Sequence, residues 1–169
     1  MLGLNKILGL PLHALVVHFA VVLVPLAAVG VLTIAFRPDW RQRYLLPIAL
    51  IAILGAGAAF VAAQSGESLE STVKASARES GASANFSEHP EQGNRAEILA
   101  IVLAAGTVGL LVMEQPLARQ RGITDLQVNG AVVACAVVAV LALGAMIIAG
   151  HSGAALVWKD VGNFVRSDG

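Results

Sequence analysis

Long runs of apolar residues alternate with shorter polar segments along this chain of 169 residues. A helix that crosses a bilayer needs about 20 mostly apolar residues, and four runs meet that length closely enough to be read as spanning helices. The predicted helices cover residues 10–36, 44–78, 90–113 and 126–150, with a polar loop at 79–89 and an interfacial tail at 151–169. The pattern predicts one all-α domain over residues 1–169, an integral membrane antiparallel four-helix bundle.

Composition supports a membrane protein over a soluble one. Apolar residues make up 57% of the chain and charged residues 13%, whereas soluble domains average about 45–50% and about 25%. The net charge of zero gives no electrostatic basis for nucleic-acid binding. Cys135 is the single cysteine, which excludes an intrachain disulfide and any CxxC motif.

Arginines near the helix ends predict an orientation. Arg37, Arg41 and Arg43 lie in the first short loop, and Arg119 and Arg121 lie in the third connection. Positively charged short loops favour the cytoplasmic side. We therefore expect a multi-pass protein of the bacterial inner membrane with both termini outside.

Small residues at a spacing of four suggest close helix packing. Gly55 and Ala59 form one such pair, and Ala105 and Gly109 form another. In lipid, small residues allow helix backbones to approach closely. We interpret these pairs as packing positions.

The polar residues of interest fall at one end of the predicted bundle. Because consecutive helices alternate in direction, the beginnings of the first and third helices meet the ends of the second and fourth. This arrangement brings together His13, His18, His89 and His151, with Gln64 and Glu67 beside them. Ionisable groups within a membrane span are usually paired or functional, and His18 is the deepest of these histidines.

His13 and His18 are five residues apart on one helix. Five residues rotate a helix by about 500°, so the two side chains point about 140° apart and differ in depth by about 7–8 Å. They are therefore not expected to bind one small ion together unless the helix start unwinds.

Neutral imidazole is a common ligand of iron, copper and zinc. Two imidazoles from facing helices can also hold the iron of a b-type haem, and small residues would leave room for the macrocycle. The chain lacks CxxCH, so covalent c-type haem is excluded. Gln64 and Glu67 are candidates to orient an imidazole by hydrogen bonding, and Glu67 could also accept a proton. The alternative is that these are ordinary hydrogen-bonded histidines at the membrane interface.

Several segments resemble a known membrane family. "GLPLHALVVHF", "AAQSGESLE", "EHPEQGNRAEILA" and "HSGAALVWKDVGNFV" are similar, in this order, to the motifs of the family called domain of unknown function 2231 (DUF2231). The first family motif typically reads G-x-P-L-H-P-x-x-V-H-F-P. The resemblance places His13, His18, His89 and His151 on the family's recurring histidines, and Gly66 and Glu67 on its small-acidic pair.

This chain departs from the family pattern at three positions. Ala14 and Ala20 stand where proline is common, and Trp158 stands where tyrosine is common. The resemblance implies a four-helix membrane protein and does not assign an activity. Some relatives look fused to cytochrome c domains. By analogy, this would suit a redox role on the outer face.

The sequence leaves enzymatic activity open and favours an electron-transfer or binding protein over an enzyme, because no nucleophile triad, phosphate loop or paired carboxylates stand out. The leading hypothesis is that the protein holds b-type haem at the four histidines for electron transfer or redox sensing, with respiratory-chain or periplasmic redox proteins as partners. One alternative is a membrane protein that binds a transition-metal ion (Cu, Fe or Zn) at the same histidines. Another is a structural subunit of a membrane complex without any cofactor. The sequence leaves the oligomeric state open.

Overall fold

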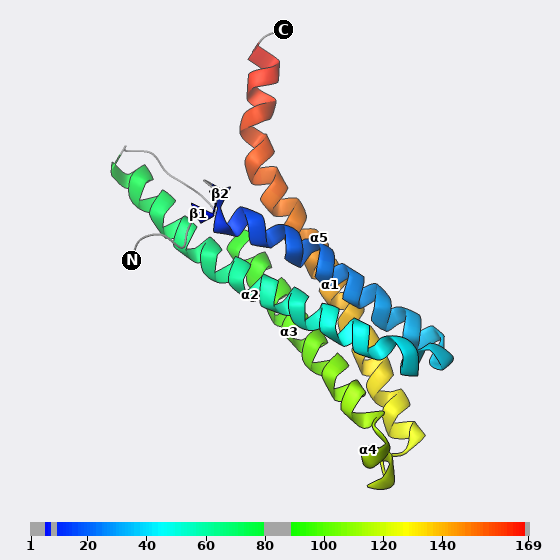
Figure 1. The fold of residues 1–169 in the computed structure, drawn as a ribbon. Coiled ribbons are helices and arrows are strands. Elements are labelled where there is room, and N and C mark those ends of the chain that lie inside the picture. Colours follow the sequence, from blue (N-terminus) through cyan, green and yellow to red (C-terminus); the bar gives the residue numbers. More distant parts are fainter. Residues whose placement is uncertain (1–5, 8–9, 80–88, 168–169) are drawn as a thin grey trace.

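Four long helices form most of the chain in the computed structural model, which describes residues 6–7, 10–79 and 89–167 (Figure 1). They are α1 (Leu12–Phe36), α2 (Arg41–Glu79), α3 (His89–Met113) and α5 (Asp125–Ser167). Two short helical segments, η1 (Pro38–Trp40) and α4 (Pro116–Gln120), lie in the connections. Two antiparallel strands of two residues each, β1 (Lys6–Ile7) and β2 (Leu10–Pro11), precede α1.

The long helices run antiparallel to their chain neighbours and form a ring of four. α1 packs against α2 and α5, and α3 packs against the same two helices, while α1 and α3 are diagonal and hardly touch. The centre of the bundle is filled mainly by small side chains, and Ala27, Ala28, Ala139 and Ala142 are all fully buried. Such side chains allow the close backbone approach that stabilises helix packing in lipid.

Large apolar side chains lie on the outside of the bundle. Phe19 is 59% exposed, Leu54 is 63% exposed and Val133 is 64% exposed. Each of the four long helices also contains a stretch that is long and apolar enough to cross a membrane. A surface of this kind is stable where lipid, and not water, surrounds it. The fold is therefore an all-α membrane bundle, as the sequence predicts.

The two ends of the bundle differ in chemistry. We call the end where α1 and α3 begin the histidine end, and the end that carries η1 and α4 the arginine end. At the arginine end, the rings of Trp40 and Tyr44 lie 5.3 Å apart and the Arg43 guanidinium lies 5.6 Å from the Tyr44 ring centre. Tryptophan and tyrosine are enriched at membrane interfaces, so these two residues mark the interface level at this end.

Some helix limits differ from those expected from the sequence. α2 begins at Arg41 instead of residue 44, directly after η1. α5 does not end at residue 150 but continues to Ser167, through most of the segment 151–169 that we expected to form an interfacial tail. No proline interrupts residues 151–167, so the helical hydrogen-bond ladder can continue. Of the predicted loop 79–89, residues 80–88 lie outside the described part of the chain.

Beyond the bundle, α2 and α5 both extend past the histidine end and diverge from one another (Figure 1). α2 has 39 residues and α5 has 43, whereas α1 and α3 have 25 each. At about 1.5 Å per residue, 25 residues suffice to cross the hydrocarbon core of about 30 Å. The extra length of α2 and α5 therefore carries helical backbone beyond the lipid on that side.

Candidate histidine site

His13 is half-buried at the start of α1 and is bonded to α2. Its Nδ1 lies 2.8 Å from the carbonyl oxygen of Ala62. A carbonyl can only accept, so the imidazole donates this hydrogen bond. Gly66, one turn further along α2, lies directly against the ring, since a Cβ at that position would be 3.1 Å from His13 Cε1. The absence of a side chain at Gly66 therefore lets α1 and α2 approach closely at this point.

His89 makes the corresponding contact between α3 and α5. Its Nδ1 lies 2.9 Å from the hydroxyl oxygen of Ser152. The Ser152 hydroxyl donates its own proton to the carbonyl of Ala149 at 3.0 Å, so it accepts the bond from the imidazole. Gly153 lies against the ring, and a Cβ there would be 2.9 Å from His89 Cε1.

These two arrangements are built alike, and we call each a histidine clasp. In both, a histidine in the first turn of a helix donates Nδ1–H to the neighbouring helix and packs on a glycine that follows a serine. The glycines belong to the pairs Ser65–Gly66 and Ser152–Gly153. With Nδ1 as the donor, a neutral imidazole carries its free lone pair on Nε2. Each clasp therefore fixes the tautomer whose Nε2 can bind a metal or accept a proton.

The two clasps lie at the same end of the bundle, because α1 and α3 both begin there. His89 of α3 lies within electrostatic range of His13 of α1 and of Glu70 of α2. Glu70 forms an ion pair with Lys74 on its own helix. Glu97 of α3 likewise lies within electrostatic range of Glu67 of α2. The histidine end is therefore a shared polar region to which all four long helices contribute.

The other two histidines have different surroundings. His18 is exposed, and its Nδ1 bonds to the carbonyl oxygen of Ala14 in its own helix at 2.5 Å. His151 is also exposed, although it directly precedes the Ser152–Gly153 pair. The structure thus places His13 and His89 at contacts between helices and His18 and His151 at exposed positions. The different directions of His13 and His18 agree with the rotation expected between them.

Gln64 and Glu67 lie on exposed positions of α2 at the same end of the bundle. No hydrogen bond joins either of them to a histidine among the described residues. The groups that orient the two clasp imidazoles are instead the Ala62 carbonyl and the Ser152 hydroxyl. Residue types and spacing did not predict these two groups, and the recurring Ser–Gly pair is the sequence signal for where the two rings pack.

Gln92 adds a further polar atom to this region. It lies one turn after His89 on α3, and its side-chain oxygen is buried without a hydrogen-bond partner among the described residues. Buried polar atoms are nearly always bonded, so such an atom suggests a water or a bound group nearby. Within residues 6–7, 10–79 and 89–167, no three or more His, Cys, Asp or Glu side chains are grouped so as to hold a metal ion.

The comparisons with known proteins agree with this architecture. The family model described as "Predicted membrane protein (DUF2231)" matches residues 9–165. No curated protein and no solved structure matches the chain. The matched range includes α1, α2, α3, α4 and almost all of α5, and both histidine clasps lie inside it. The chain therefore belongs to the DUF2231 family of predicted membrane proteins.

Proposed function

We propose that this membrane protein binds b-type haem between His13 and His89 and uses it for electron transfer or redox sensing. The observation that carries the proposal is that Nδ1 of both clasp histidines is bonded to the neighbouring helix. In a neutral imidazole that donates from Nδ1, the lone pair for a ligand is on Nε2. Histidines that ligate metals usually donate their other ring N–H in this way, which fixes the ring and makes the ligating nitrogen more basic.

The donor chemistry of the pair suits haem iron. Two neutral imidazoles on different helices would be sufficient ligands for haem iron, and interiors of helix bundles commonly provide such sites. Bound haem would supply a one-electron couple. His13 and His89 would hold it, the Ala62 carbonyl and Ser152 hydroxyl would keep the rings oriented, and Gln92 offers a buried polar atom one turn from His89.

A bare transition-metal ion is the second candidate. Zinc and similar ions usually take three or four protein ligands, so a site for Cu, Fe or Zn would need groups in addition to His13 and His89. His18 and His151 are the remaining histidines of the chain. Both lie at exposed positions, so His13 and His89 alone, which would suffice for haem iron, would not complete a site for a bare ion.

The cofactor-free alternative is also specific. Both imidazole rings pack on a glycine and bond to a neighbouring helix, so the clasps could serve only to hold the helix pairs together. In that case the protein would be a structural subunit of a membrane complex. The two functions differ in whether Nε2 of each histidine has a ligand.

The location we propose is the inner membrane of a bacterium, with the arginine end in the cytoplasm and the histidine end outside. The arginines of the first loop and of the third connection support this orientation. A haem at the histidine end would then lie close to the outer surface, where periplasmic or respiratory-chain redox proteins could exchange electrons with it.

The test is the visible spectrum of the full-length protein, purified from haem-replete cells. We expect a Soret band, with stoichiometric haem, that is lost in His13→Gln and His89→Gln. Glutamine can still donate a hydrogen bond but is not a usual haem ligand. His18→Gln and His151→Gln are the matched controls, because both residues are exposed, and they should keep their haem.

The other outcomes separate the alternatives. A colourless protein with intact helical circular dichroism and no bound metal by elemental analysis would refute the proposal and favour the structural subunit. A colourless protein with stoichiometric copper, iron or zinc that is lost with the clasp variants would favour the metal site. Haem that is lost only in the His18 and His151 variants would move the site to the outside of the bundle.

A further inference from the structure

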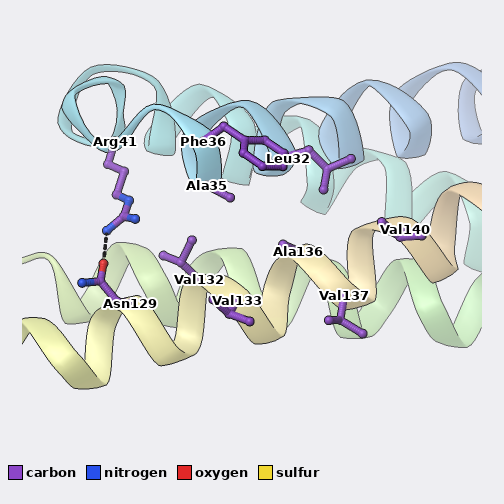
Figure 2. A pocket seen from close by; sticks show the side chains of 10 residues that line it. All are labelled: Leu32, Ala35, Phe36, Arg41, Asn129, Val132, Val133, Ala136, Val137 and Val140. Carbon is purple, nitrogen blue, oxygen red and sulfur yellow. Dashed lines mark hydrogen bonds between the residues drawn. The ribbon is translucent and has the colours of Figure 1, made fainter.

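A groove lies between α1 and α5 at the arginine end (Figure 2). The histidine clasps are at the other end of the bundle. Its volume is about 490 Å³, within the range of about 300–1,000 Å³ that small-molecule sites occupy. Apolar side chains such as Leu32, Phe36, Ala136 and Val140 line most of it. Only two of its lining residues are polar, Arg41 and Asn129, and both lie at one end (Figure 2).

Arg41 is held in place by hydrogen bonds from two of its three guanidinium nitrogens. Nε donates to the carbonyl oxygen of Ile34 at 3.2 Å, and Nη1 donates to Asn129 Oδ1 at 2.7 Å. Both acceptors are uncharged. None of the ion pairs of the described residues includes Arg41, so its positive charge is not neutralised by a carboxylate there.

Arg119, at the same end of the bundle, differs from Arg41 because it has carboxylate partners. It pairs with Glu114 at 3.0 Å and with Asp125 at 2.6 Å. The hydrogen bonds to Glu114 and then to Asp125 raise the pKa of Arg119 above its usual value. The charge of Arg119 is therefore satisfied within the protein, while the charge of Arg41 is available to an anion at the end of the groove.

The length of the groove matches one leaflet of a bilayer. Its lining on α5 runs from Asn129 to Val140, which corresponds to about 16 Å along a helix. Half of the hydrocarbon core is about 15 Å thick. Trp40 and Tyr44, next to Arg41 in the chain, mark the interface level at this end. The polar end of the groove thus lies at headgroup depth and its apolar part at acyl-chain depth.

We infer that this groove is a binding site for one anionic phospholipid, with an acyl chain between α1 and α5 and the phosphate on Arg41. The guanidinium group suits phosphate because its N–H groups match the phosphate oxygens in geometry and charge. Its positive charge, which no carboxylate of the described residues pairs, favours a lipid with a net negative charge over a zwitterionic lipid whose phosphate is balanced by its own cation. The remaining nitrogen, Nη2, is the donor that Ile34 and Asn129 leave free. This inference concerns the opposite end of the bundle and does not depend on haem binding.

Native mass spectrometry of the full-length protein with equal amounts of phosphatidylglycerol and phosphatidylcholine, of identical acyl chains, tests the inference. We expect retention of one phosphatidylglycerol per chain in preference to phosphatidylcholine. Arg41→Gln should weaken phosphatidylglycerol binding about tenfold, the effect of losing one charged hydrogen bond. Arg43→Gln is the matched control, because Arg43 is exposed and does not line the groove.

A second pair of variants tests the apolar part, in case Arg41→Gln disturbs the packing of α1 on α5. Ala136→Phe should fill the groove and reduce retention of both lipids. Ala134→Phe, two residues away on α5 and outside the groove, should not. Equal retention of the two lipids by the native protein would overturn the inference. So would equal effects of the two arginine variants, or of the two alanine variants.

Discussion

The Nδ1–H of His13 is donated to the carbonyl oxygen of Ala62 at 2.8 Å, which ties the first turn of α1 to the backbone of α2. A histidine that the sequence places at a membrane interface is thereby fixed in direction and in tautomer. The same principle applies to His89 and Ser152 between α3 and α5. Several measurable consequences depend on these contacts and on the close helix packing around them.

Gly153→Ala should destabilise the protein. A Cβ at this position would lie 2.9 Å from His89 Cε1, so the ring would have to move away from Ser152. Overpacking together with a lost hydrogen bond costs about 1–3 kcal/mol. The measurement is the thermal unfolding midpoint in detergent. Gly150→Ala is the control, because nothing lies within 4 Å of a Cβ there, and an equal loss in both variants would contradict the clasp.

Ser152→Ala should lower the unfolding free energy by about 1 kcal/mol, because it removes the acceptor of the His89 hydrogen bond. Ser152→Thr keeps a hydroxyl and should lose less. Ser71→Ala removes an exposed hydroxyl that bonds only within α2, and it should have little effect. Unchanged stability of Ser152→Ala would mean that the hydroxyl does not hold the imidazole.

Gly106→Ala should disturb the packing of α3 on α5. A Cβ at Gly106 would lie 2.7 Å from the Sγ of Cys135. Replacing Cys135 by alanine removes that sulfur, so the double variant Gly106→Ala/Cys135→Ala should recover stability, with a coupling of about 1 kcal/mol or more. The comparison requires the thermal unfolding of both single variants and the double variant. Gly109→Ala, where a Cβ meets nothing within 4 Å, should show no such coupling to Cys135.

The proposed orientation predicts which residues an impermeant thiol reagent reaches in intact cells. In a Cys135→Ala background, Glu91→Cys at the histidine end should be labelled and Asp39→Cys at the arginine end should be protected. Both positions are exposed, so burial does not explain a difference between them. Labelling of Asp39→Cys in intact cells, with protection of Glu91→Cys, would show that the protein has the opposite orientation.

The number of helices and the side of the bundle that each polar residue occupies could be predicted from the sequence, because apolar length and alternating direction determine both. The rotation of each helix about its own axis could not be predicted in the same way. Gly55 and Ala59 are buried as expected, and Gly55 lies against Val24. Ala105 and Gly109, read as an equivalent pair, are exposed, and their neighbour Gly106 makes the close contact instead.

The candidate site illustrates the same limit. Placing four histidines at one end needed only the order of the helices, but separating His13 and His89 from His18 and His151 needed the helix rotation. The hydrogen-bond partners of the imidazoles were harder still to predict from the sequence. One is a backbone carbonyl, which every residue carries, and the other is a serine hydroxyl, so residue type alone does not distinguish them.

The similarity of the two clasps has a consequence for how such a bundle can originate. Helices α1 and α2 form one hairpin and α3 and α5 form another, each with a first helix of 25 residues, a longer second helix and its own histidine on a Ser–Gly pair. Two hairpins that run in the same direction are compatible with a twofold axis along the membrane normal, which is the symmetry of a homodimer. Two copies of one such hairpin, paired about such an axis, would present the same pair of imidazoles, so a homodimer of one hairpin would be a sufficient starting point for a bundle of this kind.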